Sequence, residues 1–283
     1  MRGPIPLSGA TEVAGVIGSP IRHSLSPVLF NAAFAELGLD WAFLAFEVAP
    51  GGVEGAMAGF RALGLRGLSV TMPHKSAMAG LADRLTPAAG RLEAVNSVYW
   101  SGSEVVGDST DGAGFLDSLA AEGVDPAGMA CAVLGAGGAA RAVVLALAAA
   151  GAAEVVVINR SPEAARRAAA LAGGLARTGP PEEATRAALV VNATPLGMGG
   201  DPRMALDPAL LRAGQVVVDL VYHPLTTPFL AAAAERGARP IGGLGMLVHQ
   251  AGHQLRAWTG LDPPLSAMEA GAAAMLEGSR FSG

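Results

Sequence analysis

The stretch VLGAGGAARA, residues 133 to 142, sets three glycines between an apolar run and an alanine-rich run. Gly135, Gly137 and Ala140 fit the pattern G-x-G-x-x-(G/A), in which a strand turns tightly into a helix. The first glycine makes the turn, the second lets the backbone approach a pyrophosphate, and the last small residue keeps helix and strand close. The helix N-terminus then faces the phosphate charge. The motif predicts a dinucleotide site, and a βα turn built of small residues for packing alone is the alternative.

The surrounding sequence supports a parallel sheet. Apolar runs without a polar face recur along the chain, each followed by a helix-like or loop-like segment, and they cover 130–135, 154–159, 188–194 and 215–222. Such runs are typical of parallel strands that are covered by helices on both faces. We therefore expect a Rossmann-type domain around the glycine motif.

The end of the second run bears on the choice of dinucleotide. A site that prefers NAD commonly carries an acid here for the ribose 2′-hydroxyl. This run ends Ile158–Asn159–Arg160–Ser161, with no acid, and Arg160 suits the 2′-phosphate of NADP. A solvated arginine at a helix start is the alternative interpretation.

The first 110 residues contain a second alternating set. Strand-like runs cover 12–18, 41–48, 67–71 and 94–100, and helix-like runs cover 26–37, 52–63 and 73–82. Residues 245–279 have a helical pattern. This alternation predicts an α/β fold of two domains.

Composition narrows the function classes. The 283 residues are 51% hydrophobic and 15% charged, with a net charge of −5, so no overall basic field indicates nucleic acid or an anionic membrane. The first 18 residues lack a continuous apolar stretch, and the apolar segment 139–158 is interrupted by charges and glycine, so we expect neither a signal peptide nor a membrane span. The single cysteine, Cys131, fits a small buried residue in a reducing compartment.

The segment GLSVTMPHK, residues 67–75, ends in an unusual lysine. Leu68, Val70 and Met72 alternate as in a strand, and Pro73 suits a first helical turn. Lys75 would then lie where the helix dipole disfavours a cation.

Several other polar residues are candidates for a site. Ser24 and Ser26 would point the same way in an extended segment and suit a carboxylate or polyol, although Ser26 can equally cap the helix that follows. Asp108 and Asp111 precede another helix, which either can cap. Asn96 interrupts an apolar strand and needs a partner. His249 and His253, four apart, have zinc-pair spacing, but a helix-surface pair fits better because further ligands are missing from the sequence.

Together, nine segments in order resemble the shikimate dehydrogenase family over almost the whole chain. They are GSPIRHSLSP, SVTMPHK, AVNSV, GDSTDGAGF, GAGGAAR, NRS, VNATPLGM, DLVYHPLTTPFL and GLGMLVHQ. The resemblance implies hydride transfer between NADP and 3-dehydroshikimate or shikimate. It also implies a substrate-binding domain, 1–110 completed by helices within 245–283, and a Rossmann-like NADP domain, 111–244.

The resemblance assigns roles residue by residue. Lys75 and Asp111 match the catalytic pair, and Ser24 and Ser26 match the hydroxyls that hold the substrate carboxylate. Further substrate contacts match Thr71, Asn96, Tyr222 and Gln250. The cofactor side matches Gly135, Ala136, Gly137, Gly138, Ala139, Asn159, Arg160, Ser161, Asn192, Thr194, Leu220 and Gly243.

The chain departs from the family pattern in places. Ser161 and Ala164 stand where an NADP signature usually has threonine and a second basic residue, so use of NAD or of both cofactors stays open. Quinate or an amino analogue of shikimate is an alternative substrate, and a binding sensor without turnover is an alternative of another class. We expect a small-molecule substrate, no metal, a cytoplasmic location and a monomer or homodimer.

Overall fold

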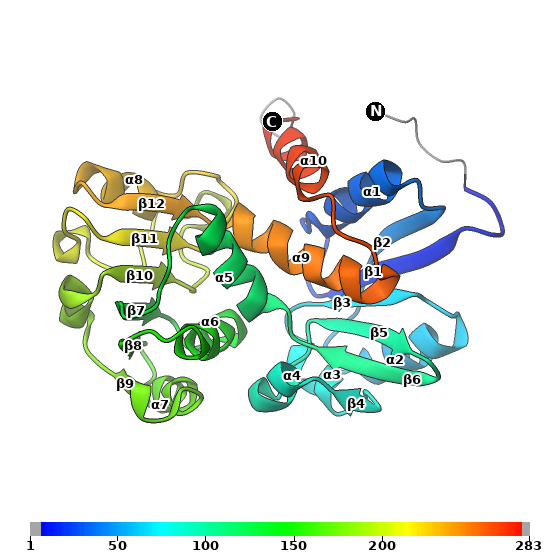
Figure 1. Cartoon of the computed structure of the whole chain (residues 1–283), viewed down its shortest axis with the longest axis horizontal. Helices are drawn as coiled ribbons and strands as arrows, with labels where there is room; N and C mark the ends of the chain where they lie inside the picture. Colours follow the sequence, from blue (N-terminus) through cyan, green and yellow to red (C-terminus); the bar gives the residue numbers. More distant parts are fainter. Residues whose placement is uncertain (1–6, 279–283) are drawn as a thin grey trace. The chain divides into compact units, whose positions relative to one another are not determined.

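The computed structural model describes residues 7–278, which form two compact units, each built on its own six-stranded sheet (Figure 1). Within the described residues, the first unit runs to Thr110 and resumes at Val248, and the second unit is Asp111–Leu247. No helix of residues 7–278 is long and apolar enough to cross a membrane.

The sheet of the first unit has the order β2-β1-β3-β5-β6-β4. Its strands are β1 (Glu12–Gly18), β2 (Trp41–Glu47), β3 (Gly67–Val70), β4 (Arg84–Leu85), β5 (Ser97–Ser101) and β6 (Glu104–Asp108). β5 runs antiparallel to both of its neighbours, and the other pairs are parallel. The carboxyl ends of β1 and β3 therefore lie at one edge of the sheet, where the motifs GSPIRHSLSP and SVTMPHK continue.

Helices from both ends of the chain pack in the first unit. They are α1 (Ser26–Leu37), α2 (Val53–Ala62), α3 (Lys75–Ala79), α4 (Pro87–Leu92), most of α9 (Leu244–Thr259) and α10 (Leu265–Gly278). α10 lies against α1, and a Cβ added at Gly271 would be 3.1 Å from the Cβ of Ala32. On α9, the Trp258 ring stacks on Phe30 of α1 at 4.8 Å between ring centroids. The C-terminal helices thus complete the core of the N-terminal segment.

The second unit has an all-parallel sheet in the order β12-β11-β10-β7-β8-β9. Its strands are β7 (Ala130–Leu134), β8 (Glu154–Ile158), β9 (Ala176–Thr178), β10 (Leu189–Asn192), β11 (Val216–Asp219) and β12 (Arg239–Gly242). Numbered from β7, this order is 3-2-1-4-5-6, the doubly wound order of Rossmann folds, whose direction reverses between β7 and β10.

Both faces of this sheet are buried, which explains the missing polar face. Alternate residues of one strand enter opposite cores: Val155 and Val157 face one cluster, and Val156 and Ile158 face the other. The covering elements are α5 (Asp111–Ala121), α6 (Gly138–Ala149), α7 (Pro162–Ala170), α8 (Pro228–Glu235) and the short 3-10 helices η1 (Gly173–Leu175), η2 (Pro181–Arg186), η3 (Met198–Gly200) and η4 (Pro208–Leu210).

The predicted fold class is confirmed, and each strand predicted from the sequence is present. The helix predicted over 73–82 is shorter, because Pro73 and His74 form a turn and α3 begins at Lys75. Asn96 precedes β5 rather than lying in it. The predicted substrate-binding domain, 1–110 with 245–283, includes residues 1–6 and 279–283, which lie outside the described residues.

Candidate active site

The glycine motif forms the turn between β7 and α6. Gly135 has φ +111°, a backbone conformation that favours glycine, and an added Cβ would lie 3.1 Å from Cγ2 of Thr194 and 3.2 Å from the carbonyl oxygen of Ala193. The turn after β7 therefore touches the loop after β10. This contact lies where the strand order reverses, the place at which open α/β sheets bind ligands.

The start of α6 has the properties of a phosphate site. Its N-cap, Gly137, makes no side-chain cap, and a Cβ added there would meet nothing within 4 Å. Gly137 and Gly138 are both exposed. Uncapped N–H groups at a helix N-terminus beside open space fit the pyrophosphate of a dinucleotide.

The segment after β8 is organised by short-range hydrogen bonds. Asn159 Nδ2 donates to the carbonyl oxygen of Ser161 at 3.1 Å, and Ser161 Oγ accepts from the N–H of Ala164 at 3.3 Å, which caps α7. Arg160 lies between them with an exposed side chain. The helix cap thus leaves the guanidinium at the surface beside the end of β8.

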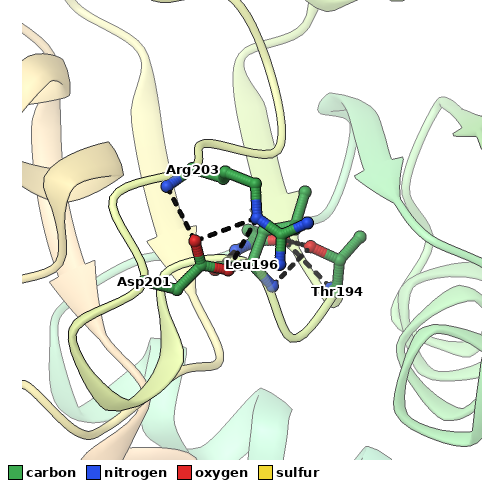
Figure 2. A network of polar contacts seen from close by, with 5 residues as sticks. Thr194, Leu196, Asp201 and Arg203 are labelled. Carbon is green, nitrogen blue, oxygen red and sulfur yellow. Dashed lines mark hydrogen bonds and ion pairs between the residues drawn. The ribbon is translucent and has the colours of Figure 1, made fainter.

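The loop after β10 is held by its own polar side chains (Figure 2). Asn192 is fully buried, and its Oδ1 accepts from both the N–H and the hydroxyl of Thr194 at 2.9 and 2.7 Å. Thr194 Oγ1 in turn accepts from the N–H of Leu196 at 3.3 Å. These bonds fix Thr194 next to the glycine turn.

Farther along the same loop, the guanidinium of Arg203 donates to both carboxylate oxygens of Asp201 (Figure 2). The backbone N–H of Arg203 also donates to Asp201 Oδ1, at 3.0 Å. These bonds from Arg203 hold the pKa of the Asp201 carboxyl below its ordinary value.

Asp219 ends β11 and was not singled out from the sequence. Its Oδ1 accepts from Asn192 Nδ2 at 2.8 Å and from the N–H of Val221 at 3.0 Å, and its Oδ2 accepts from the Thr227 hydroxyl at 2.6 Å. The carboxyl is fully buried, and desolvation raises its pKa. A charged residue closing an apolar strand was the signal that could have identified it.

Leu220 and Gly243, both assigned to the cofactor side, lie in direct backbone contact. A Cβ at Gly243 would come within 2.3 Å of the carbonyl oxygen of Leu220, so only glycine fits without a shift. Tyr222, two residues after Leu220, is half-buried, and desolvation raises its pKa.

In the first unit, Ser24 and Ser26 lie in a turn and a helix start, not in an extended segment. α1 begins at Ser26, and its N-cap position, Leu25, makes no side-chain cap, so Ser26 is not the cap that one interpretation assigned to it. Ser24 Oγ accepts from the N–H of Ser26 at 3.3 Å. The turn brings the two serines together.

Thr71 and Lys75 belong to the turn that joins β3 to α3. The N–H of His74 donates to the carbonyl oxygen of Thr71 at 3.0 Å, and the buried His74 ring contacts the Val48 carbonyl oxygen through Nε2 at 2.7 Å. Lys75 is half-buried, and its carbonyl oxygen accepts from the N–H of Val95 at 2.9 Å. The lysine is therefore tied to the residue before Asn96.

Asn96 joins two further segments. Its Oδ1 accepts from the N–H of Thr110 at 2.8 Å, and its Nδ2 donates to Thr110 Oγ1 at 3.0 Å and to Gln250 Oε1 at 3.3 Å. The Thr110 hydroxyl donates to the carbonyl oxygen of Gln250 at 3.0 Å. Asp111, the first residue of α5, follows Thr110 directly.

Hydrogen bonds thus join Asn96, Thr110 and Gln250 in one cluster, and the backbone of Lys75 is bonded to Val95 next to it. Sequence reasoning missed Thr110 and also Gln254, a fully buried glutamine one turn after Gln250. Within residues 7–278, no group of three or more His, Cys, Asp or Glu residues could hold a metal ion.

Comparison with known proteins tests the predicted family. The family described as shikimate dehydrogenase substrate binding domain matches residues 16–98, and the shikimate 5'-dehydrogenase C-terminal domain matches residues 243–270. A shikimate dehydrogenase (NADP(+)) of Moorella thermoacetica is 45% identical over 281 residues, which cover 94% of each chain. The chain belongs to the shikimate dehydrogenase family. The family predicted from the nine motifs is confirmed.

Solved structures of the family have the same fold. A crystal structure of a shikimate dehydrogenase in complex with NADP+ has a TM-score of 0.92 at 32% identity, covering 97% of this chain and 99% of that one. The Listeria monocytogenes enzyme in complex with shikimate and NAD has a TM-score of 0.87 at 35% identity, covering 93% and 97%. Residues 130–223 also match the family described as NADP oxidoreductase, coenzyme F420-dependent. The chain therefore consists of an N-terminal substrate-binding domain and a Rossmann-like NADP-binding domain.

Proposed function

We propose that the protein catalyses the reversible NADP-dependent reduction of 3-dehydroshikimate to shikimate, a step in aromatic amino acid biosynthesis. The observation that carries the proposal is the 45% identity, over 94% of both chains, with a relative named shikimate dehydrogenase (NADP(+)). The hydrogen-bonded cluster of Asn96, Thr110 and Gln250 supports it, because amide and hydroxyl groups suit the recognition of a polyhydroxy acid.

Lys75 and Asp111 are the proposed acid–base pair. NADPH supplies the hydride when it is bound. As negative charge builds on the substrate oxygen, the Lys75 ammonium stabilises that oxygen and donates a proton, and the neutral amine accepts one in the reverse direction. Asp111 orients the lysine. Within the first unit, the carbonyl oxygen of Lys75 accepts from the N–H of Val95, and Asn96 holds Thr110, the residue before Asp111.

The substrate carboxylate is assigned to the hydroxyls of Ser24 and Ser26. In the turn before α1, the Ser24 hydroxyl accepts from the N–H of Ser26. Thr71, Asn96, Tyr222 and Gln250 are the further proposed contacts. Their hydroxyl and amide groups match the hydroxyls of shikimate in chemistry.

For the cofactor, the backbone from Gly135 to Ala139 is the proposed pyrophosphate site, and Arg160 the proposed partner of the 2′-phosphate. Asn159 and Ser161 shape that turn, and Asn192, Thr194, Leu220 and Gly243 are assigned to the nicotinamide side. A second candidate is use of NAD, since the Listeria monocytogenes relative is described in complex with shikimate and NAD. The proposed domains are 1–110 with 245–283 for substrate and 111–244 for cofactor.

Initial rates of the purified protein with shikimate, quinate and aminoshikimate, each with NADP+ and with NAD+, test the proposal. Rapid reduction of NADP+ with shikimate alone is the expected result. Preference for quinate, for the amino compound or for NAD+ would assign the protein to a side pathway. Binding of NADP+ without turnover of any substrate would favour a sensor.

A further inference from the structure

Gln254 is a buried amide that none of the assigned roles explains. It lies on α9, one turn after Gln250, with 1% of its surface exposed. Its Oε1 accepts from the Ser69 hydroxyl at 2.5 Å, and its Nε2 donates to the carbonyl oxygen of Asn96 at 3.1 Å and to Gln250 Oε1 at 2.9 Å. Every polar atom of a buried glutamine needs a partner, and this one has partners at both ends.

Two backbone groups fix which way the amides of this cluster face. The N–H of Thr110 can only donate, so the atom of Asn96 that faces it is the oxygen, and Asn96 Nδ2 is turned toward Gln250. The carbonyl oxygen of Asn96 can only accept, so the atom of Gln254 that faces it is the nitrogen. If the Asn96 amide were rotated by 180°, two donors would face each other at Thr110. If the Gln254 amide were rotated, two acceptors would face each other at the Asn96 carbonyl oxygen.

The two amide nitrogens converge on one atom of Gln250. Asn96 Nδ2 lies 3.3 Å and Gln254 Nε2 lies 2.9 Å from the same side-chain atom. Because both neighbours are donors, that atom is the oxygen. The NH₂ end of Gln250 therefore faces away from this cluster.

We propose that Gln254 is a positioning residue, which holds the oxygen of Gln250 so that Gln250 presents its NH₂ group to the substrate. The inference rests on the proposed role of Gln250 as a substrate contact. It adds that Gln250 acts as a hydrogen-bond donor to the substrate. The substrate group recognised here is then an oxygen acceptor, such as a carboxylate or a hydroxyl lone pair. Without Gln254, the amide of Gln250 loses one of the two donors that select this orientation.

The first test is made on the free protein and does not depend on turnover. The side-chain NH₂ signal of Gln250 is identified in a ¹⁵N-labelled sample by its loss in Gln250→Ala. In Gln254→Met, which keeps side-chain length without hydrogen bonds, we expect this signal to shift and broaden. Ser69→Ala combined with Gln254→Met is the matched variant, because it also removes the hydroxyl left unpaired. An unchanged Gln250 signal in both variants overturns the inference.

Kinetics supply the second test. We expect Gln254→Met to raise the KM for shikimate about tenfold, the scale of one well-placed hydrogen bond, while the KM for NADP+ changes little. Because the substitution removes the acceptor of the Ser69 hydroxyl and a donor to the Asn96 carbonyl oxygen, it also lowers the melting temperature. In a double-mutant cycle with Gln250→Ala, Gln254→Met should add almost nothing, because it acts through Gln250.

The failures are distinguishable. Additive effects of the two substitutions on the KM for shikimate would show that Gln254 does not act through Gln250. Absence of shikimate turnover in the wild-type protein contradicts the proposed function, and the Gln250 signal then decides the orientation on its own.

Discussion

Asn192 donates a 2.8 Å hydrogen bond from Nδ2 to Oδ1 of Asp219, and the two residues are register partners at the ends of β10 and β11. Asp219 thereby anchors the loop that carries Thr194, while its other oxygen holds Thr227. Replacing Asp219 with alanine removes an acceptor from three donors, of which Asn192 Nδ2 keeps the carbonyl oxygen of Leu196 at 3.4 Å. We expect Asp219→Ala to lower the free energy of unfolding by about 2–3 kcal/mol, measured by urea denaturation.

Asp219→Asn is the matched variant, because it keeps an oxygen for Asn192 and Val221. Burial raises the pKa of Asp219, so its contribution to stability is present below the pKa in the unfolded chain, about 3.9, and is lost as pH rises through the raised folded value. Asparagine does not titrate, so the Asp219→Asn variant does not lose stability in this way as pH rises. Its stability relative to the wild-type protein should therefore improve as pH rises from 4 to 8. A difference that stays constant over that range would contradict the assignment of a raised pKa to Asp219.

Gly243→Ala tests the backbone contact with Leu220. The added Cβ would come within 2.3 Å of a carbonyl oxygen, so the backbone must move. We expect a loss of about 1–3 kcal/mol in the free energy of unfolding, together with weaker NADP+ binding. Wild-type stability in this variant would show that the contact relaxes without cost.

Gly137→Ala separates cofactor binding from folding. The added methyl group meets nothing within 4 Å, and the φ of −75° suits alanine, so stability should change by less than about 0.5 kcal/mol. The same methyl group would stand in the proposed pyrophosphate site. We expect the Kd for NADP+, measured by calorimetry, to rise at least about tenfold, because the backbone can no longer approach the phosphates. Unimpaired binding would remove Gly137 from the cofactor site.

Arg160→Ala tests the choice of cofactor. If Arg160 binds the 2′-phosphate, kcat/KM for NADP+ should fall about tenfold or more, the scale of a hydrogen bond to a charged group, while kcat/KM for NAD+ stays unchanged. Arg166→Ala, which removes an exposed arginine of the following helix α7, is the control and should leave kcat/KM for both cofactors unchanged. An equal loss with both cofactors would mean that Arg160 does not read the 2′-phosphate.

The strands of the second sheet were predictable where they are buried on both faces, because each reads as an apolar run. β12 was missed because Pro240 interrupts it, which an edge strand tolerates, and β9 has only three residues without an apolar pattern. The sequence of β6 has the apolar residues of an ordinary strand, but the strand was not predicted. The short α3 resembled a longer helix because Pro73 suits a helix start as well as the turn it occupies.

The site residues that lie within contiguous motifs were predictable as candidates, and their assigned roles remain proposals. Gln254 and Thr110 were not found, because their significance comes from partners far away in the chain: Ser69 and Gln254 are 185 positions apart. A glutamine on a helix is ordinarily a surface residue, and nothing local indicates that this one is buried. Sequence patterns identify groups that carry chemistry, whereas the side chains that orient them become visible only in three dimensions.

Lys75 is the only lysine in the 283 residues, which allows an unusually direct test of its role. Lys75→Met keeps most of the side-chain stem and removes the amine, so we expect kcat to fall about 10²–10⁴-fold, the usual contribution of a general acid–base group, with the melting temperature preserved. Chemical modification of the wild-type protein tests the same role independently: because the sequence has one lysine, an amine-directed reagent should modify only Lys75 and the α-amino group. Mass spectrometry should show that shikimate protects Lys75 and that inactivation follows its modification. Arg66→Met, which removes another cationic side chain from the first unit, should turn over normally. Near-normal turnover of Lys75→Met, or inactivation without modification of Lys75, would remove this residue from the catalytic pair.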